Sequence, residues 1–320
     1  MKKNKIKDTG LEVTELSFGT SSLGSMPDTY GYEVPEDRAQ KTLNRFFQGP
    51  VNMLDTSRNY AMGESEKRIG KAIKENGGWP KGFLLSTKLD RNMDTLVLDK
   101  NRARESLEES LKTLNVDSVD ILFLHDPEYA KDITDITKKD GAMDELFKIK
   151  NEGLAKAVGV AMGKVDIMFP LLKDWDFDVV INHNRYTLIN REANEMYDYA
   201  YSKNIAIFNA APYAGGVLAK GPDNFKKVTY QDASEEKLAP AREFEKVCKK
   251  HNVEMGAAAL QFSLRDKRIA STICGVTSIE SIEKNLKWAN CEISLEFWEE
   301  VLKLPFSSND PESDRIFTPG

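Results

Sequence analysis

Eight short apolar runs, many of them rich in β-branched residues, recur along the chain, and longer segments of mixed polarity separate them. Runs of this kind are typical of strands that are buried on both faces. Alternation of such strands with helical segments predicts a parallel sheet covered by helices. Eight strands favour a closed α/β fold, the (β/α)8 TIM barrel, over an open doubly wound sheet. The runs are residues 16–18, 51–54, 83–86, 119–124, 155–160, 179–181, 205–208 and 269–273.

The segments between many of these runs carry apolar residues at helical spacing. An open dinucleotide-binding sheet should have the pattern G-x-G-x-x-G directly after its first strand. Residues 19–24 (GTSSLG) lack that spacing, which supports the barrel. No linker rich in Pro, Gly or Ser divides the chain, so we expect a single domain over residues 1–320. Helices are expected at residues 63–76, 101–114, 144–152, 191–203, 241–251 and 279–289.

Three segments lie outside this repeat. Residues 6–13, around Thr9 and Gly10, predict a β-hairpin that could plug the floor of the barrel. Residues 213–236 form an insertion after the seventh strand, and residues 304–320 form a C-terminal tail. Insertions and tails of this kind often build substrate sites, although disorder is the alternative for the last ten residues.

Charge and composition exclude several functional classes. The net charge of −6 argues against a nucleic-acid-binding surface, which needs clustered Lys and Arg. No apolar stretch reaches the 18 residues that a membrane span requires, and the polar N-terminus shows no signal peptide. Cys248, Cys274 and Cys291 form neither a disulfide framework nor a zinc motif. We therefore expect a cytoplasmic protein that acts on a small molecule, while its oligomeric state stays open.

Ionisable residues follow three consecutive predicted strands. Asp55 comes directly after the second run, Lys88 soon after the third and His125 directly after the fourth, while Tyr60 lies five residues past Asp55. In (β/α)8 barrels the working residues lie where strands end and loops begin. Because neighbouring strands are about 4.8 Å apart, we expect these four side chains to converge in one pocket.

The four residue types form a coherent set for proton transfer to or from an oxygen atom. A free tyrosine titrates near pH 10. A neighbouring ammonium should favour the phenolate and lower that pKa, while a carboxylate anchors the ammonium. Read from the residues alone, Lys88 could instead be the Schiff-base nucleophile of a barrel lyase or aldolase. The alternative without a functional role is that charged residues at strand ends are simply exposed to solvent.

Three motifs around these residues resemble those of the aldo-keto reductases: residues 54–66 (LDTSRNYAMGESE), 86–88 (STK) and 120–125 (DILFLH). The resemblance covers nearly the whole chain and implies a (β/α)8 barrel that binds an extended nicotinamide cofactor. It implies that Tyr60 is the general acid or base, that Lys88 and Asp55 tune it, and that His125 orients the substrate. No metal is needed, because hydride passes directly between nicotinamide and the substrate carbon.

Residues 185–188 (RYTL) and 209–213 (NAAPY) are most similar to the branch with L-galactose, L-fucose, D-threo-aldose and pyridoxal dehydrogenases. A sugar, aldehyde, ketone or alcohol is therefore the expected substrate class. Many family members hold the nicotinamide carboxamide with a Ser-Asn pair and a Gln, where this chain has Ala161-Met162 and His183. His183, Asn182 or backbone must replace them. Ala210 stands where an aromatic residue often stacks on the nicotinamide.

The same resemblance implies where the rest of the cofactor lies. The glycines of the loop from Pro212 permit close approach to the pyrophosphate. In NADP-selective members a Lys and an Arg often stand at the positions of Gly275 and Ser281; their absence favours NAD, although Lys284 and Lys287 keep NADP open. The expected cofactor contacts are Gly19, Thr20, Asp55, Asn182, His183, Pro212, Tyr213, Gly215, Leu218, Gly275, Thr277, Ser281, Lys284 and Asn285.

Three functional hypotheses follow. The leading one is an oxidoreductase that uses NAD or NADP. A lyase that uses Lys88 would leave the cofactor-like segments around Gly215 and Asn285 unexplained. A non-catalytic regulatory subunit of the same fold is the third, and the complete set of four ionisable residues argues against it.

Overall fold

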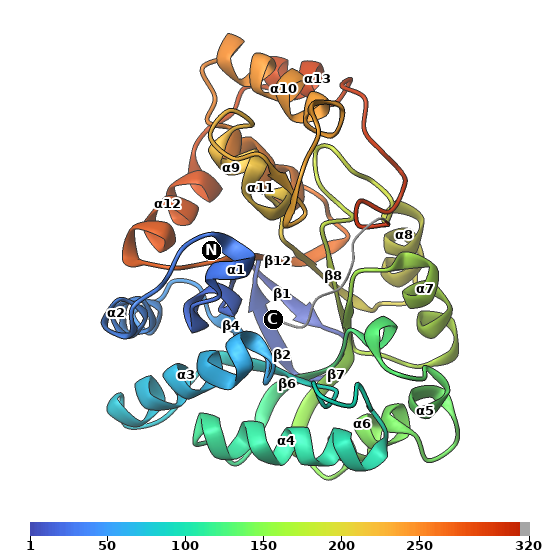
Figure 1. The fold of residues 1–320 in the computed structure, drawn as a ribbon. Coiled ribbons are helices and arrows are strands. Elements are labelled where there is room, and N and C mark those ends of the chain that lie inside the picture. Colours follow the sequence, from blue (N-terminus) through green and yellow to red (C-terminus); the bar gives the residue numbers. More distant parts are fainter. Residues whose placement is uncertain (314–320) are drawn as a thin grey trace.

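The computed structural model describes residues 1–313 and contains a closed barrel of eight parallel strands (Figure 1). The strands follow one another around the barrel in chain order, and the last pairs with the first, as the sequence predicts. Each predicted apolar run forms one of them. They are β3 (Leu16–Gly19), β4 (Met53–Asp55), β5 (Leu84–Leu89), β6 (Val119–His125), β7 (Ala155–Met162), β8 (Val179–His183), β9 (Ala206–Ala210) and β12 (Ile269–Gly275).

A ring of helices surrounds the barrel. Five of the six predicted helices lie in this ring, namely α3 (Glu64–Glu75), α4 (Lys100–Leu114), α6 (Ala142–Asn151), α8 (Asn194–Ser202) and α12 (Ile279–Asn290). The sequence patterns missed α2 (Glu36–Phe46), α7 (Val165–Asp174) and α11 (Met255–Leu264). Pro170 lies inside α7, where a proline argues against a helix, and α11 is buried on nearly every side and so shows no clear polar face. None of the described helices has the length and apolar character needed to cross a membrane.

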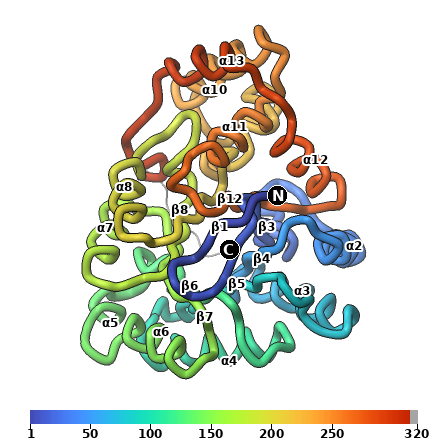
Figure 2. The backbone as a smooth tube through the Cα atoms, turned by 180° about the vertical axis from the view of Figure 1, so that it is seen from behind, coloured from blue at the N-terminus to red at the C-terminus, as the bar shows by residue number. Residues whose placement is uncertain are grey.

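Two apolar cores hold the fold. The larger one lies between the strands and the helices. The smaller one fills the barrel itself, with residues such as Met53, Phe123 and Phe208. The predicted hairpin is present as β1 (Lys3–Ile6) and β2 (Leu11–Thr14), and its Ile6 and Val13 belong to this inner core. The hairpin therefore closes one end of the barrel, as seen from behind in Figure 2.

Contacts identify that end as the floor, where the strands begin. Asn4 donates from its amide to the carbonyl of Ala270, at the start of β12, over 2.7 Å. Lys7 likewise reaches the carbonyl of Phe177, just before β8. The opposite end, where the strands finish, is left to the loops and short elements: η1 (Ser21–Gly24), α1 (Pro27–Tyr30), η2 (Tyr60–Gly63), η3 (Pro127–Tyr129) and α5 (Thr134–Thr137).

The predicted insertion is an ordered structure. It holds η4 (Ala214–Gly216), α9 (Val217–Lys220) and a small hairpin of β10 (Lys227–Val228) and β11 (Gln231–Asp232). The following helix, α10 (Glu235–Lys250), begins six residues earlier than expected, because Ser234 caps it and the helix continues through Pro240. A further short helix, α13 (Leu295–Val301), precedes the tail.

The described part of the tail is bound to the barrel. The carbonyl of Ser307 accepts from the backbone N–H of Arg191, and that of Asn309 accepts from the side chain of Asn190. Arg185, which is 1% exposed, forms ion pairs with Asp310 and Glu312. The tail therefore covers buried charge as far as residue 313; residues 314–320, part of the segment for which disorder was the alternative, lie outside the described residues.

Candidate active site

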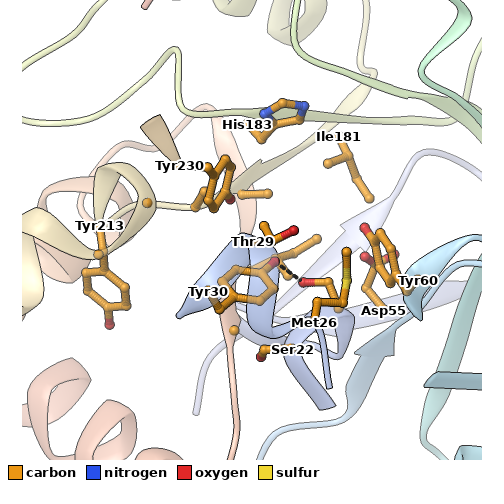
Figure 3. A pocket seen from close by; sticks show the side chains of 18 of the residues that line it. Ser22, Met26, Thr29, Tyr30, Asp55, Tyr60, Ile181, His183, Tyr213 and Tyr230 are labelled. Atoms are coloured by element: carbon orange, nitrogen blue, oxygen red, sulfur yellow. Dashed lines mark hydrogen bonds between the residues drawn. The ribbon is translucent and has the colours of Figure 1, made fainter. Parts of the chain in front are cut away.

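The strand ends bring the four expected residues to one cavity. Asp55, Lys88 and His125 lie at or near the ends of β4, β5 and β6, and Tyr60 opens the short helix η2. All four line a cavity of about 490 Å³ that extends from this cluster to Asn285 and Trp288. Figure 3 shows Asp55 and Tyr60 at one end of it and Tyr213 at the other.

Lys88 is the centre of the cluster. Its ammonium, 2% exposed, donates to Asp55 Oδ2 over 2.8 Å, to the carbonyl of Thr56 over 2.6 Å and lies 3.1 Å from the Tyr60 hydroxyl. Asp55 also accepts from the hydroxyl of Ser86 over 2.9 Å. A buried ammonium with its counter-charge and three oxygen partners is fully satisfied, so its position beside Tyr60 is well defined.

Burial governs the pKa of Tyr60, and the net shift is opposite to the lowering expected from Lys88. Burial raises the pKa of Tyr60 well above 10, and the carboxylate of Asp55 raises it further. The ammonium of Lys88, 3.1 Å from the hydroxyl, does not offset this rise. The phenol therefore keeps its proton and can act as an acid.

The backbone around Tyr60 is strained. Ala61 and Met62, which follow it directly, both have φ above +50°, in the left-handed region that non-glycine residues rarely adopt. Gly24 makes room for this turn, since a Cβ added there would lie 2.5 Å from Ala61 Cβ. Strain of this kind persists where surrounding structure holds it, and here it places a tyrosine on a cavity wall.

His125 has a partner that sequence reasoning missed. Its Nδ1 lies 2.5 Å from Oδ1 of Asp90, which is 0% exposed. Oδ2 of Asp90 accepts from the hydroxyl of Ser57 over 2.6 Å and from the backbone N–H of Asn59 over 3.2 Å. A signal was available, because Asp90 is two residues beyond Lys88 and alternation along a strand puts both on one face.

The charges around His125 favour its protonated form. Burial opposes the imidazolium, but the carboxylates of Asp126 and Asp90 outweigh it and raise the pKa of His125. Conversely, burial tends to raise the pKa of Asp90, and His125 and the hydrogen bond from Ser57 lower it overall. The ring of His125 meets that of Tyr60 edge to face, with centroids 5.7 Å apart.

The structure separates the expected cofactor contacts into two groups. Residues in the first line the same cavity as the four ionisable residues. These are Gly19, Asp55, His183, Tyr213, Gly215, Gly275, Ser281, Lys284 and Asn285. Residues in the second are not part of its lining: Thr20, Asn182, Pro212, Leu218 and Thr277.

The direction of the side chain explains why several residues of the second group do not line the cavity. The hydroxyl of Thr20 bonds the carbonyl of Asp55, and Leu218 is buried in the core between barrel and helices. The amide nitrogen of Asn182 donates to the carbonyls of Met162 and Gly163, so this side chain turns away from the cavity. Of the two side chains expected to hold the carboxamide, Asn182 and His183, only His183 lines the cavity.

His183 is held by residues near it in space. Its Nδ1 lies 3.4 Å from a guanidinium nitrogen of Arg185 and 3.7 Å from Glu312 of the tail. Ala161 and Ala210 line the cavity nearby, whereas Met162 is buried in the outer core. The tail thus reaches the residue expected to contact the nicotinamide.

Two segments meet across the middle of the cavity. Tyr30 of α1 and Tyr230 of the insertion contact edge to face, with ring centroids 5.9 Å apart (Figure 3). The hydroxyl of Tyr30 also bonds that of Ser21 over 2.6 Å. The segments that follow β3 and β9, the two neighbours of β12 in the barrel, therefore meet over the cavity.

A long cavity at the carboxyl ends of the strands, lined by a proton-transfer cluster, defines a (β/α)8 enzyme. Comparison with known proteins gives the family. The chain belongs to the Aldo/keto reductase family, whose sequence profile matches residues 15–304. It is therefore an oxidoreductase, and the cofactors of this family are the nicotinamide dinucleotides.

Several characterised relatives are similar over most of their length. L-galactose dehydrogenase of Arabidopsis thaliana is 31% identical, with 87% of this chain and 85% of the relative covered. D-threo-aldose 1-dehydrogenase of a Pseudomonas species is 26% identical, covering 91% and 94%. The holo form of aldo-keto reductase AKR11C1 from Bacillus halodurans shares the fold, with a TM-score of 0.79 at 22% identity over 99% of this chain and all of that one.

Proposed function

We propose that the protein transfers hydride between a nicotinamide cofactor and a sugar or a small carbonyl or alcohol, with Tyr60 as general acid or base. The observation that carries this is the contact of the Tyr60 hydroxyl with Lys88 at 3.1 Å, inside a cavity that continues to Asn285. Lys88 and Asp55 position the phenol, and His125 offers a second polar group to the substrate oxygen.

The residues of the channel fit a dinucleotide. Gly275 leaves open space, since a Cβ added there would meet nothing nearer than Ser22 Oγ at 3.9 Å. Lys220 and Lys284 bring positive charge to the same wall, and Asn285 and Trp288 close its far end. When bound, the nicotinamide accepts or supplies the hydride.

Contacts of Ser281 and Lys287, which lie near the expected position of a 2′-phosphate, favour NAD over NADP. The Ser281 hydroxyl is engaged in capping α12, where it accepts from the backbone N–H of Thr277 over 2.9 Å. Lys287 is paired with Glu254 at 2.7 Å. Of the two lysines expected to meet a 2′-phosphate, this leaves Lys284, which is a point charge and not an arginine fork. Tryptophan fluorescence titration should show tighter binding of NADH than of NADPH; the reverse order would refute this part of the proposal.

The sugar hypothesis rests on the relatives and on the lining. The relatives are named for L-galactose, D-threo-aldose and pyridoxal. Around Tyr60 the cavity presents Asn59, Arg91, Asp126 and His183, a polar set suited to hydroxyl groups. The lyase alternative is weakened, because Asp55, the Thr56 carbonyl and Tyr60 occupy the Lys88 ammonium. A cytoplasmic location stays a prediction.

Replacing Tyr60 with Phe tests the catalytic assignment, because it removes only the hydroxyl. Turnover of aldoses, pyridoxal and simple aldehydes should fall at least a hundredfold, as expected for loss of general acid–base catalysis. Cofactor affinity, measured by fluorescence quenching, should change less than threefold. Undiminished turnover would disprove the role of Tyr60. Failure of the unmodified protein to bind either cofactor below millimolar concentration would disprove the oxidoreductase proposal for this site.

A further inference from the structure

The carboxylate of Asp90 is the feature that the proposed reaction does not yet use. It lies inside the barrel rim, 0% exposed, with both oxygens accepting hydrogen bonds. Its partners are Nδ1 of His125, the Ser57 hydroxyl and the Asn59 N–H. The last two can donate, so an ionised carboxylate at this place satisfies all of them at once.

An ionised carboxylate decides which nitrogen of His125 carries the proton. Because a carboxylate only accepts, Nδ1 must be the donor in their contact. The Ser57 hydroxyl, 3.2 Å from the same Nδ1, could donate or accept and would leave the tautomer undecided. Nε2 lies on the opposite side of the ring, 3.7 Å from Asp126, a residue of the cavity wall.

We propose that Asp90 is a positioning residue that fixes His125 with Nδ1–H inward and, together with Asp126, keeps a second proton on Nε2, toward the substrate. This rests on the proposed function, in which His125 faces the substrate oxygen. A protonated Nε2 can only donate, so its partner must be an accepting oxygen, such as that of a carbonyl, an alkoxide or a hydroxyl group. Asp126 adds charge but, at 3.7 Å, no hydrogen bond.

The groups that face His125 act in opposite directions. Asp90 and Asp126 favour the imidazolium, and Lys88 on β5, two residues before Asp90, opposes it. The Lys88 charge is largely balanced by Asp55. Tyr60 presents the edge or face of its ring and, with its pKa raised, no charge at neutral pH. The two carboxylates therefore outweigh Lys88 and favour the protonated form of His125.

Nuclear magnetic resonance of ¹⁵N-histidine in the full chain tests this without requiring turnover. The chain has only three histidines, so His125 can be assigned by its replacement with Gln. In the unmodified protein we expect His125 to titrate above 6.5 and its neutral form to be the Nδ1–H tautomer. A midpoint at or below 6.5, or an Nε2–H tautomer, would overturn the proposal without any Asp90 variant.

Variants separate the two roles of Asp90. Asp90→Asn and Asp126→Asn each remove a charge and should lower the midpoint of His125, by roughly one pH unit for Asp90→Asn. Asp90→Ala also removes the acceptor, so the neutral ring should divide between both tautomers. The basic limb of the kcat–pH profile should shift with the midpoint, while cofactor KM stays within threefold.

Glu66→Gln is the matched control. Glu66 is also 0% exposed, and its carboxyl group lies against the hydroxyls of Thr87 and Ser110, not against a histidine. Its replacement should leave the tautomer and midpoint of His125 in place. If Asp90→Asn and Asp90→Ala both fold, as judged by circular dichroism, and leave His125 unchanged, Asp90 is only structural and the proposal is wrong. If Asp90→Ala does not fold, Asp90→Asn and the unmodified tautomer still decide.

Discussion

Glu66 gives a direct test of how burial changes the pKa of a carboxyl group in this protein. Its side chain is fully buried and forms few hydrogen bonds. Oε1 accepts from the Thr87 hydroxyl over 2.6 Å, and Oε2 has no hydrogen-bond partner among the described residues. Burial raises the pKa of Glu66 from an ordinary 4.5 to about 7, against the hydroxyls of Thr87 and Ser110, which lower it. The folded protein thus prefers the neutral carboxyl.

The difference between the pKa of Glu66 in the folded and in the unfolded chain makes the stability of the protein depend on pH. The unfolded chain loses this proton near pH 4.5, whereas the folded chain keeps it until about pH 7. Folding is therefore penalised increasingly as pH rises through that window, and the penalty is constant above it. Since one pKa unit is worth about 1.4 kcal/mol, the full penalty is roughly 3 kcal/mol.

Glu66→Gln removes the titration and keeps the shape. The stability of the variant minus that of the unmodified protein should rise by roughly 3 kcal/mol between pH 4.5 and pH 8. Reversible urea unfolding at matched pH values measures this difference, and other buried carboxyls cancel because both proteins contain them. A difference that stays flat within about 1 kcal/mol would refute the argument from burial.

Two further predictions test the packing of the site. Gly24→Ala places a Cβ 2.5 Å from that of Ala61. The free energy of unfolding in urea should fall by about 1–3 kcal/mol, and kcat should fall at least tenfold because the turn that carries Tyr60 shifts. A normal kcat would contradict the role of this turn. Glu312→Gln removes one carboxylate from the buried Arg185 and leaves Asp310 at 2.6 Å. The free energy of unfolding should fall by about 2–3 kcal/mol, and cofactor binding should weaken through His183. Unchanged stability and affinity would show that the tail does not support the pocket.

The sequence was informative wherever a strand end decides the position of a side chain. Asp55, Lys88 and His125 follow apolar runs directly or closely, and the geometry of a parallel barrel then brings them together. Alternation along β8 could in principle have told Asn182 from His183, because neighbours on a strand face opposite sides. That step needed the strand's exact phase, which a short apolar run does not define.

Other features depend on contacts between distant parts of the chain. Arg185 and Glu312 are 127 positions apart, and nothing local in either segment predicts their ion pair. The pKa of Tyr60 depends on the balance between burial and compensated charge, which requires distances. Helix α11 has no helical periodicity in its sequence because it is apolar and buried on nearly every side, and α7 contains Pro170, which argues against a helix.

The hairpin that closes the floor of the barrel provides an attachment point away from the cavity. Its turn, around the exposed Asp8, lies at the end of the barrel opposite the cavity, and it contacts the beginnings of strands rather than the rim. A linker attached at Asp8 would fasten the enzyme to an electrode or bead with its substrate entrance directed into solution. The described tail, by contrast, lies beside His183. Immobilisation through the described tail residues would bring the support toward the cavity, so orientation on a surface should govern the activity of the attached enzyme.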